Sequence, residues 1–193
     1  IVNYYRVFMV DLSLSCGLCH SSQTSFLFRK EGYSFHSCLS CGLQFVYPQP
    51  SLSSLHEGYN AQELSSMHYY LDHLEEDKYM FQKRYALLKP FLGDPGKVLD
   101  VGSNIGTFAS VLQEEGWDVH ALDLNKDAVA YMEKHYSFPV SAVPIEEASF
   151  VGESFDFVSM NDVVEHLPDF HAVLDKLSLL LKKDGFLMLT TPD

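Results

Sequence analysis

The chain has 193 residues, 47% of them hydrophobic, and carries a formal net charge of −13 at pH 7. This length and composition suit one α/β core with a small appendage and exclude a largely disordered chain. Nucleic acid and anionic membrane surfaces attract basic patches, and the sequence shows none, so both are disfavoured as partners. No apolar run reaches the roughly 18–20 residues that span a bilayer, and no clear signal-peptide cleavage site follows the start of the chain. We therefore expect a cytoplasmic protein that does not enter a membrane.

Four cysteines near the start of the chain form the pattern C-x2-C-x18-C-x2-C: Cys16, Cys19, Cys38 and Cys41. This spacing is typical of a structural zinc site, in which two turns deliver four thiolates to one ion. Gly17 and Gly42 are expected to allow the tight turns, and the segment between the pairs reads as a hairpin that turns at residues 30–32. The sequence therefore predicts a zinc-ribbon-like module over residues 12–47.

Two other interpretations of the cysteines stay open, namely two redox pairs or two disulfides. Neither C-x-x-C opens a helix in a thioredoxin-like βαβ context, which argues against redox chemistry. His20 and His36 lie nearby in the sequence and could each replace a thiolate. Because four cysteines already complete a tetrahedral set, we expect both histidines on the surface.

Residues 48–96 are predicted to hold a linker and covering helices. The segment 48–60 is rich in Pro and Ser, and a helical pattern runs from about Glu63 to Leu92. Apolar residues at spacings of three, four and seven give this helix one apolar face, formed by Leu74, Phe81, Tyr85, Leu88 and Leu92. Gly93 and Pro95 are expected to end it.

From Lys97 onward, strands alternate with helices. Strands are predicted at 97–102, 118–123, 139–143, 155–161 and 186–192, and helices at 107–116, 126–136 and 169–185. Such alternation favours right-handed βαβ units and a Rossmann-like, doubly wound, mostly parallel α/β sheet over residues 97–193. The sequence stops just after the fifth strand, so we expect C-terminal strands to be missing, and an exposed sheet edge could support an oligomer.

The loop after the first of these strands, in the stretch VLDVGSNIG, carries Asp100, Gly102 and Gly106. Ligands of open parallel sheets bind beyond the carboxyl ends of the strands, where this loop is expected. A dinucleotide loop needs a further glycine, and a carboxylate two residues before the first glycine would repel a pyrophosphate. Asp123, at the end of the second strand, is placed to accept hydrogen bonds from ribose hydroxyls. A ribose with an ammonium group and no phosphate describes S-adenosylmethionine.

At this point the sequence resembles the class I S-adenosylmethionine-dependent methyltransferases, from about Lys97 to Pro192. The resemblance rests on VLDVGSNIG, ALDLN, IEEASF, FDFVSMNDVVEHL and LKKDGFLMLTTPD. It implies that the cofactor is held at its methionine end by Asp100, Gly102, Ser103 and Gly106, at the ribose by Asp123, at the adenine by Leu124, Ile145 and Glu146, and beside the sulfonium by Asn161. The family usually has a third glycine where Ser103 or Asn104 stands, and it has two strands that this sequence lacks.

His166 is the candidate general base, because imidazole titrates near neutrality. It follows Asp162 and Glu165 in NDVVEHL, at the expected mouth of the pocket. In the alternative interpretation, Asp162 caps a helical turn and His166 bonds a backbone carbonyl. Small-RNA 3′-end methyltransferases carry a similar Glu-x-x-Glu-His that binds a divalent metal, which is a minor hypothesis here.

The predicted function is methyl transfer from S-adenosylmethionine to a small molecule. The cysteine module followed by CGLQFVYPQPS resembles the front end of certain bacterial methyltransferases, many of which act on sugars or other small metabolites, so a sugar or glycan precursor is an expected acceptor. Tyr59, Tyr69 and Tyr70 are candidates to stack on the sulfonium, and ordinary packing in the core is the alternative interpretation of each. Two rivals remain: a non-catalytic scaffold whose zinc module recruits a partner, and an NAD-dependent oxidoreductase.

Overall fold

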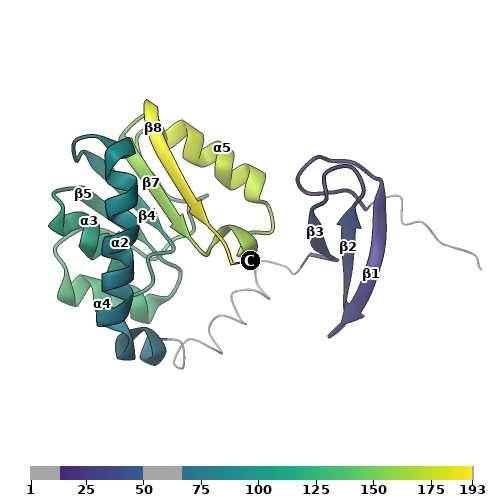
Figure 1. Ribbon diagram of the computed structural model, residues 1–193, viewed down its shortest axis with the longest axis horizontal. Helices are drawn as coiled ribbons and strands as arrows, with labels where there is room; N and C mark the ends of the chain where they lie inside the picture. The colour runs from purple at the N-terminus through teal and green to yellow at the C-terminus, as the bar shows by residue number, and fades with distance from the viewer. Residues whose placement is uncertain (1–13, 50–66, 193) are drawn as a thin grey trace, which may run out of the picture. The chain divides into compact units, whose positions relative to one another are not determined.

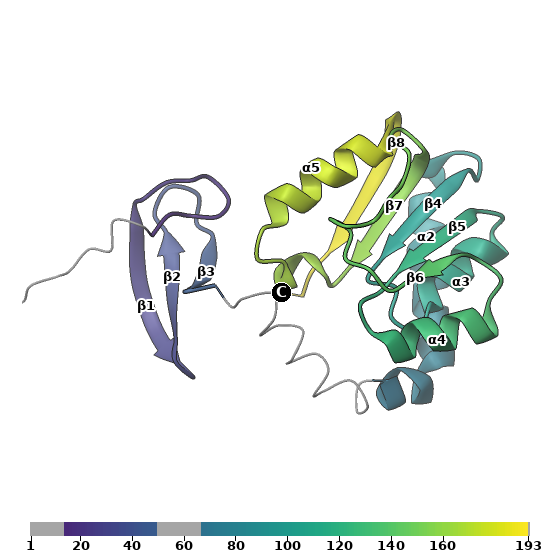
Figure 2. The ribbon, with the colours of Figure 1, turned by 180° about the vertical axis from the view of Figure 1, so that it is seen from behind.

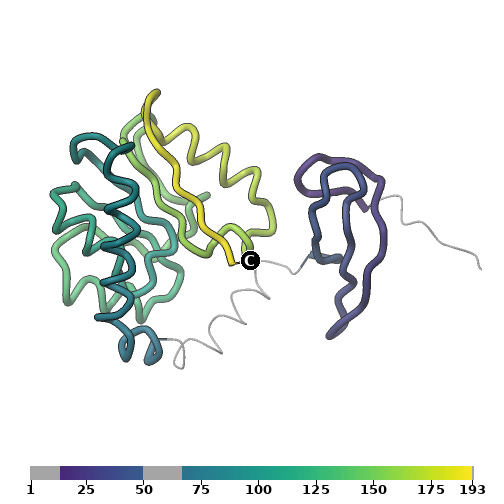
Figure 3. The backbone as a smooth tube through the Cα atoms, in the orientation of Figure 1, coloured from purple at the N-terminus to yellow at the C-terminus, as the bar shows by residue number. Residues whose placement is uncertain are grey.

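The computed structural model describes residues 14–49 and 67–192, which belong to two compact units divided at residue 51. The predicted linker lies for the most part outside the described residues, and so does Tyr59. The tube in Figure 3 follows the path of the chain through both units. Within the described ranges, no helix is long and apolar enough to cross a membrane.

The first unit is a three-stranded antiparallel sheet in the order β1-β2-β3 (Figure 1). Its strands are β1 (Thr24–Lys30), β2 (Tyr33–Cys38) and β3 (Gln44–Tyr47). The predicted hairpin is confirmed, and both of its turn residues, Glu31 and Gly32, have positive φ angles of 51° and 87°. Aromatic rings hold the strands together, since Phe28 stacks on Phe35 with ring centroids 4.4 Å apart.

The second unit is built on five parallel strands in the order β6-β5-β4-β7-β8 (Figure 2). They are β4 (Lys97–Val101), β5 (Asp118–Leu122), β6 (Val140–Ser141), β7 (Phe155–Asn161) and β8 (Leu181–Thr190). After β4 the chain adds strands on one side, and then crosses to the other side of β4 for β7. This reversal confirms the predicted Rossmann-like doubly wound sheet and places its switch point between β4 and β7.

Helices cover both faces of this sheet, and their bounds are α2 (Leu74–Leu92), α3 (Thr107–Glu114), α4 (Lys126–His135) and α5 (Phe170–Leu180). Successive residues of β4 point to opposite faces, so Val98 packs with α2, α3 and α4, whereas Leu99 packs with α5. The first core also holds a buried hydrogen bond from Trp117 Nε1 to Tyr85 Oη, 3.0 Å long. This bond joins α2 to Trp117, the residue that directly precedes β5.

Several predicted boundaries differ from the structure, and the largest differences concern two helices and one strand. The helix expected over 63–92 is helical at residues 67–72, is interrupted at His73, and continues as α2. β6 has only two residues. The helix expected to reach residue 185 ends at Leu180, because Leu181 already pairs with Phe155 of β7 and Lys182 Nζ donates to both carboxylate oxygens of Asp156 at 2.8 Å. Residues 181–185, which the sequence pattern predicts as helix, therefore belong to strand β8.

Candidate functional site

The four cysteines of the first unit come together as predicted. Their Sγ atoms all lie within 4.8 Å of one another, with Cys16 and Cys41 separated by 3.6 Å and Cys19 and Cys38 by 3.5 Å. Four sulfurs bound to one zinc ion at 2.3 Å lie about 3.8 Å apart, whereas a disulfide brings two sulfurs to about 2 Å. All four cysteines are free thiols in the structure, so the arrangement fits a tetrahedral ion rather than the disulfide alternative.

The two cysteine turns repeat the same hydrogen bonds. Cys16 N donates to Ser21 O, and Cys38 N donates to Leu43 O in the same relation. Backbone N–H groups two residues after Cys16 and Cys38 each approach the sulfur at 3.4 Å. The residue after each turn is left-handed, His20 with φ 56° and Gly42 with φ 83°. The expectation for Gly42 is therefore confirmed, whereas His20 rather than Gly17 takes the left-handed position in the first turn.

His36 lies on β2 among aromatic rings and outside the cysteine cluster. Its ring stacks on Phe45 at 5.9 Å and meets the rings of Phe26 and Tyr47 edge-on. The expectation that it lies on the surface is only half right, because it is partly buried and its Nδ1 atom is buried without a hydrogen-bond partner.

The thiol pKa values show why this cluster suits a cation. Burial opposes ionisation of Cys38, but backbone N–H groups of Cys41 and Ser40 outweigh it and lower the pKa of Cys38 to about 6. Although the Leu43 N–H favours the Cys41 thiolate, burial and the neighbouring thiols raise the pKa of Cys41 to about 12. The four sulfurs cannot all ionise side by side unless a positive charge lies between them.

In the second unit, the glycine loop follows β4 at the switch point of the sheet. The N–H groups of Gly102 and Ser103 both donate to Leu122 O at the end of β5, at 2.8 and 2.9 Å. Gly102, Asn104 and Gly106 are all left-handed, with φ angles of 72°, 50° and 80°. A side chain at Gly106 would lie 2.9 Å from atoms of Met132 and Tyr136. The loop is thus pinned to β5 and opens directly into α3.

Asp123 fastens this loop from the end of β5. Its Oδ2 accepts the Asn104 N–H at 2.6 Å, and its Oδ1 accepts the Asn125 N–H at 2.8 Å. Burial raises the pKa of Asp123, although these N–H groups act in the opposite direction. A carboxylate has about four acceptor positions, and the Leu124 N–H also favours the charged form of Asp123, so at least one position remains for a ribose hydroxyl.

Asp100 is buried beneath the loop, with 2% of its surface exposed. Its Oδ1 accepts a hydrogen bond of 2.6 Å from Ser159 Oγ of β7. Burial raises the pKa of Asp100 from 3.8 to about 6, against the opposing effect of the Ser159 and Ser103 hydrogen bonds. A buried carboxylate whose hydrogen-bond partners are all neutral is prepared to pair with a cationic ligand.

The remaining cofactor candidates lie at the same ends of the strands but differ in exposure. Leu124, directly after Asp123, is 42% exposed. Ile145 is buried in the core on the α5 face, so only its backbone is available, and Glu146 is exposed. Asn161 ends β7 and is partly buried.

Arg84 and Tyr70, from the predicted covering helix, interact with residues at the carboxyl ends of β5 and β7. Of the two, the sequence analysis named only Tyr70. Arg84 of α2, which the sequence did not single out, donates from NH1 to Asn161 Oδ1 at 2.6 Å. Burial raises the pKa of Tyr70, and the charges of Asp77, Asp162 and Asp123 add to this effect. Tyr70 therefore lies near the acids at the ends of β5 and β7. Tyr69 instead stacks on His73 at 4.3 Å and is largely exposed.

The segment after β7 differs from the predicted helical turn. Val164–His166 form a short 3-10 helix without a side-chain cap, and Asp162 precedes it with φ 54°. Asp162 Oδ1 accepts from Thr190 Oγ1 at 3.2 Å, so the proposed capping role is wrong. His166 is exposed. In the described part of the chain, the cysteines are the only group gathered as metal ligands, and Asp162, Glu165 and His166 are not gathered in this way.

Gly102→Ala is expected to disrupt the loop. The new Cβ would collide with Val163 Cγ2 and would also carry the strain of a left-handed alanine, about 1–2 kcal/mol. Gly116→Ala is a matched control, since Gly116 has φ 97° and a new Cβ there would lie 3.7 Å from Pro95, an ordinary contact distance. Urea unfolding and S-adenosylhomocysteine titration should show a stability loss in both variants and a binding loss only in Gly102→Ala. Equal affinities in the two variants would contradict this placement of the loop.

Comparison with known proteins agrees with this geometry. The profile of the family described as "Methyltransferase domain" matches residues 70–193. A ubiquinone biosynthesis O-methyltransferase of Bordetella avium is 29% identical over 101 residues, 49% of this chain and 42% of that protein. Phosphoethanolamine N-methyltransferase 2 of Caenorhabditis elegans is 30% identical over 120 residues, 57% of this chain and 27% of that protein. The chain thus spans less than half the length of these curated relatives.

A solved structure shows the same fold. The 1,6-didemethyltoxoflavin-N1-methyltransferase of Burkholderia thailandensis, with bound 1,6-didemethyltoxoflavin and S-adenosylhomocysteine, superposes with a TM-score of 0.60 at 22% identity. The superposition covers 85% of this chain and 71% of that one. Because the family profile covers well over half of the chain and the sheet has the expected strand order, the chain belongs to the methyltransferase domain family and is a class I S-adenosylmethionine-dependent methyltransferase by fold.

Proposed function

We propose that this chain transfers a methyl group from S-adenosylmethionine to a small molecule. The observation that carries the proposal is the Asp123 carboxylate, which holds the Gly102–Gly106 loop through the Asn104 N–H at the switch point. Its remaining acceptor capacity is proposed to bind a ribose hydroxyl. A loop that needs to accept a pyrophosphate would not have Asp100 buried beneath it. The NAD-dependent rival is therefore disfavoured.

The described residues offer a partner for each polar part of the cofactor. Asp100 is proposed to pair with the ammonium group, beside the backbone of Gly102, Ser103 and Gly106, and Asp123 with the ribose. Arg84 is proposed to pair with the methionine carboxylate, because its guanidinium reaches the end of β7 through Asn161. The adenine is proposed to lie between Leu124 and the backbone of Ile145 and Glu146, with Asn161 beside the sulfonium.

Methyl transfer needs alignment more than it needs a reactive side chain. The cofactor, when bound, supplies an electrophilic methyl group, and the protein contributes by holding the nucleophile in line and excluding water. Tyr70 is proposed to cover this space, because it lies near Asp123 and Asp162. His166 remains the proposed base for an oxygen or nitrogen nucleophile, on its chemistry and its position just after β7.

The first unit is proposed to bind zinc through its four cysteines, for a structural purpose, since four thiolates leave no open coordination position. The proposed domain boundaries are 12–47 for this zinc-ribbon-like module, 48–96 for the linker and covering helices, and 97–193 for the cofactor-binding domain. Helix α2 and residues 67–72 belong to the second compact unit, which is consistent with a covering role.

An oxygen nucleophile on the acceptor is favoured by the name of the ubiquinone biosynthesis relatives, although another relative is named as an N-methyltransferase. A sugar or glycan precursor is the finer proposal, and it rests only on the resemblance of the cysteine module and the sequence after it. A sugar precursor and the acceptors of these relatives would all be small molecules. The net charge of −13 favours a small-molecule acceptor over RNA.

Calorimetric titration of the zinc-replete chain with S-adenosylhomocysteine tests the proposal. We expect saturable one-to-one binding that Asp123→Ala abolishes, because the variant loses both the ribose acceptor and the bond that holds Asn104. Asp118→Asn is the matched control, since Asp118 lies exposed at the other end of β5. Binding of neither S-adenosylhomocysteine nor NAD by a folded chain would favour the scaffold, and binding of NAD would favour the oxidoreductase.

A further inference from the structure

The helix that covers the sheet is divided into two pieces at His73. Residues 67–72 form the first piece, named the front segment here, and α2 is the second. His73 leaves the helical conformation, with φ −111° and ψ 14°. Its Nδ1 atom donates to Tyr69 O at 2.8 Å, in competition with its own backbone N–H, which lies 3.2 Å from the same oxygen. A side chain that enters the hydrogen-bond ladder of a helix in this way bends or breaks the helix.

The two pieces are held to the rest of the second unit very differently. On α2, Phe81, Tyr85 and Leu88 pack in the hydrophobic core of the sheet. Lys78 Nζ, also on α2, donates to Glu114 Oε1 of α3 at 2.6 Å. In contrast, no residue of the front segment is buried, and none belongs to either hydrophobic core. Local movement costs least where few buried apolar contacts hold a segment, so the front segment can move while α2 stays in place.

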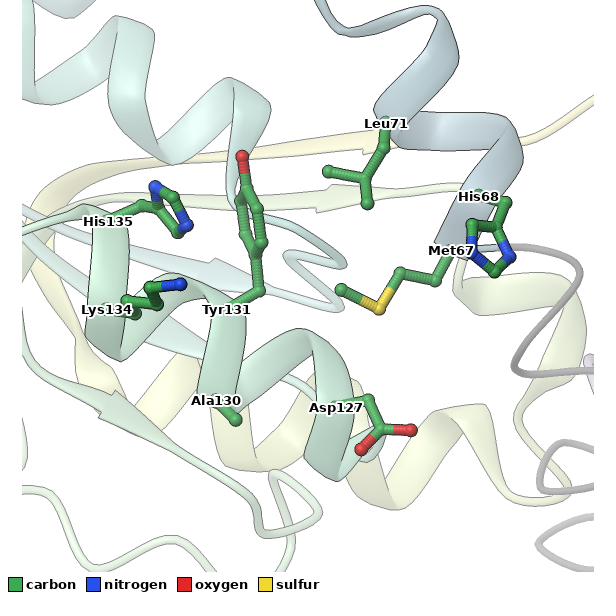
Figure 4. A pocket seen from close by; sticks show the side chains of 8 residues that line it. All are labelled: Met67, His68, Leu71, Asp127, Ala130, Tyr131, Lys134 and His135. Carbon is green, nitrogen blue, oxygen red and sulfur yellow. The ribbon is translucent and has the colours of Figure 1, made fainter.

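Open space lies between the front segment and α4. Figure 4 shows a hollow of about 490 Å³ there, in which Met67 and Leu71 face the ring of Tyr131. A second hollow of about 270 Å³ borders the first turn of α2, where Leu74 and Glu75 line it, and Tyr131 lines both hollows. The front segment can therefore approach α4 without displacing a packed side chain, and Met67 and Leu71 would then pack on Tyr131.

This hollow reaches the proposed cofactor site. Asp127, in the first turn of α4, lines the hollow, and Asp123 and Leu124 come shortly before that turn. The front segment also carries Tyr70, which lies near Asp123 and Asp162 at the carboxyl ends of β5 and β7. A front segment that packs on α4 therefore brings its tyrosine over the residues proposed to hold the ribose and the adenine.

We propose that the front segment is a lid, which turns about His73 and closes on α4 when the cofactor is bound. In the closed position Met67 and Leu71 pack on Tyr131, and Tyr70 covers the ribose. A ligand favours one conformation only through contacts that differ between the two, and Tyr70 supplies that difference. Closure excludes water from the methyl group and slows release of the cofactor. The lid rests on the proposed function, because the cofactor is the ligand on which it closes.

Hydrogen exchange of the full zinc-replete chain, measured by mass spectrometry, tests the lid with S-adenosylhomocysteine as the probe. A saturating concentration should slow exchange of the amides of residues 67–73 by at least about tenfold, because closure protects the segment from local opening. The amides of residues 81–92 should exchange equally with and without the probe, since this part of α2 already packs on the core.

Ala130→Trp should hold the lid open, because it places a ring in the hollow from an exposed position on α4. The variant should still bind S-adenosylhomocysteine, but without slower exchange at residues 67–73, and the probe should dissociate about tenfold faster. Glu133→Trp is the matched control, since Glu133 is exposed on the same helix but does not line the hollow. It should behave like the unchanged chain. Thermal melts establish that both variants are folded.

The outcomes separate the lid from the proposed function. If the chain binds S-adenosylhomocysteine and exchange at residues 67–73 does not change, the lid is wrong and the proposed function stands. The lid is also wrong if Ala130→Trp shows the same slowing of exchange as the unchanged chain. A folded chain that does not bind S-adenosylhomocysteine overturns both proposals.

Discussion

Cys38→Ser is expected to unfold the first unit and to leave the second unit folded. In the described part of the first unit only Leu14, Cys16 and Cys38 are buried, so its hydrophobic core contributes little. Zinc binding contributes about 10–16 kcal/mol to the folding of zinc-finger peptides of comparable design, and a serine cannot replace a thiolate at a buried corner of the site. The second unit has its own two hydrophobic cores, and neither contains any of the four cysteines.

Zinc content and two-dimensional NMR spectra check this expectation. The variant should lose its zinc together with the dispersed signals of β1, β2 and β3, and a chelator should have the same effect on the unchanged chain. Ser37→Ala, on the preceding residue of β2, is the control and should keep both. A Cys38→Ser chain that retained one zinc ion and an intact β1–β2 hairpin would refute the four-cysteine site.

Asp100→Asn is expected to make the protein more stable and a poorer binder of S-adenosylhomocysteine. The folded state raises the pKa of Asp100 from 3.8 to about 6, so the ionised carboxylate destabilises the fold. This cost is absent below about pH 4, grows as the pH rises to about 6, and is constant above that at about 3 kcal/mol. Asparagine still accepts the Ser159 hydrogen bond but carries no charge.

Urea unfolding at pH 7 should therefore show a gain of up to about 3 kcal/mol for Asp100→Asn, and unfolding near pH 4 should show almost none. The affinity for S-adenosylhomocysteine should fall by about tenfold to a hundredfold at pH 7, because a charge-assisted bond to the ammonium group is lost. In the unchanged chain the affinity should also weaken as the pH falls below about 6, and the variant should lack this dependence. Lower stability of the variant at pH 7 would contradict the role of burial.

The fold was largely readable from the sequence because its signals are local. The apolar run before Asp100 and the glycines after it specify a buried strand and a left-handed loop, and both are found where they were expected. The cysteine spacing likewise fixes which four sulfurs meet. Asp123 could be placed because strand ends in a parallel sheet share one edge.

The predictions differ from the structure where contacts with a distant part of the chain determine the local conformation. The pattern of residues 169–185 is helical, but pairing with Phe155 and Asp156 draws Leu181 and Lys182 into β8. Arg84 was missed because α2 was read for its apolar face, and no pattern along that helix indicates that the guanidinium meets Asn161, 77 residues later. Contacts of this kind depend on tertiary packing, which residue spacing does not encode.

The left-handed backbone of Asn104 bears on how this loop can change over evolution. The family's third glycine is missing, yet the conformation that glycine would provide is retained, with φ 50°. Asparagine is among the few non-glycine residues that adopt it readily, and its Oδ1 also accepts the Ile105 N–H at 2.7 Å. Position 104 should therefore have a narrow spectrum of permitted substitutions, with glycine and aspartate allowed and valine or isoleucine rejected. A family profile would record the asparagine as loss of a motif, although the backbone at position 104 of this chain is still left-handed.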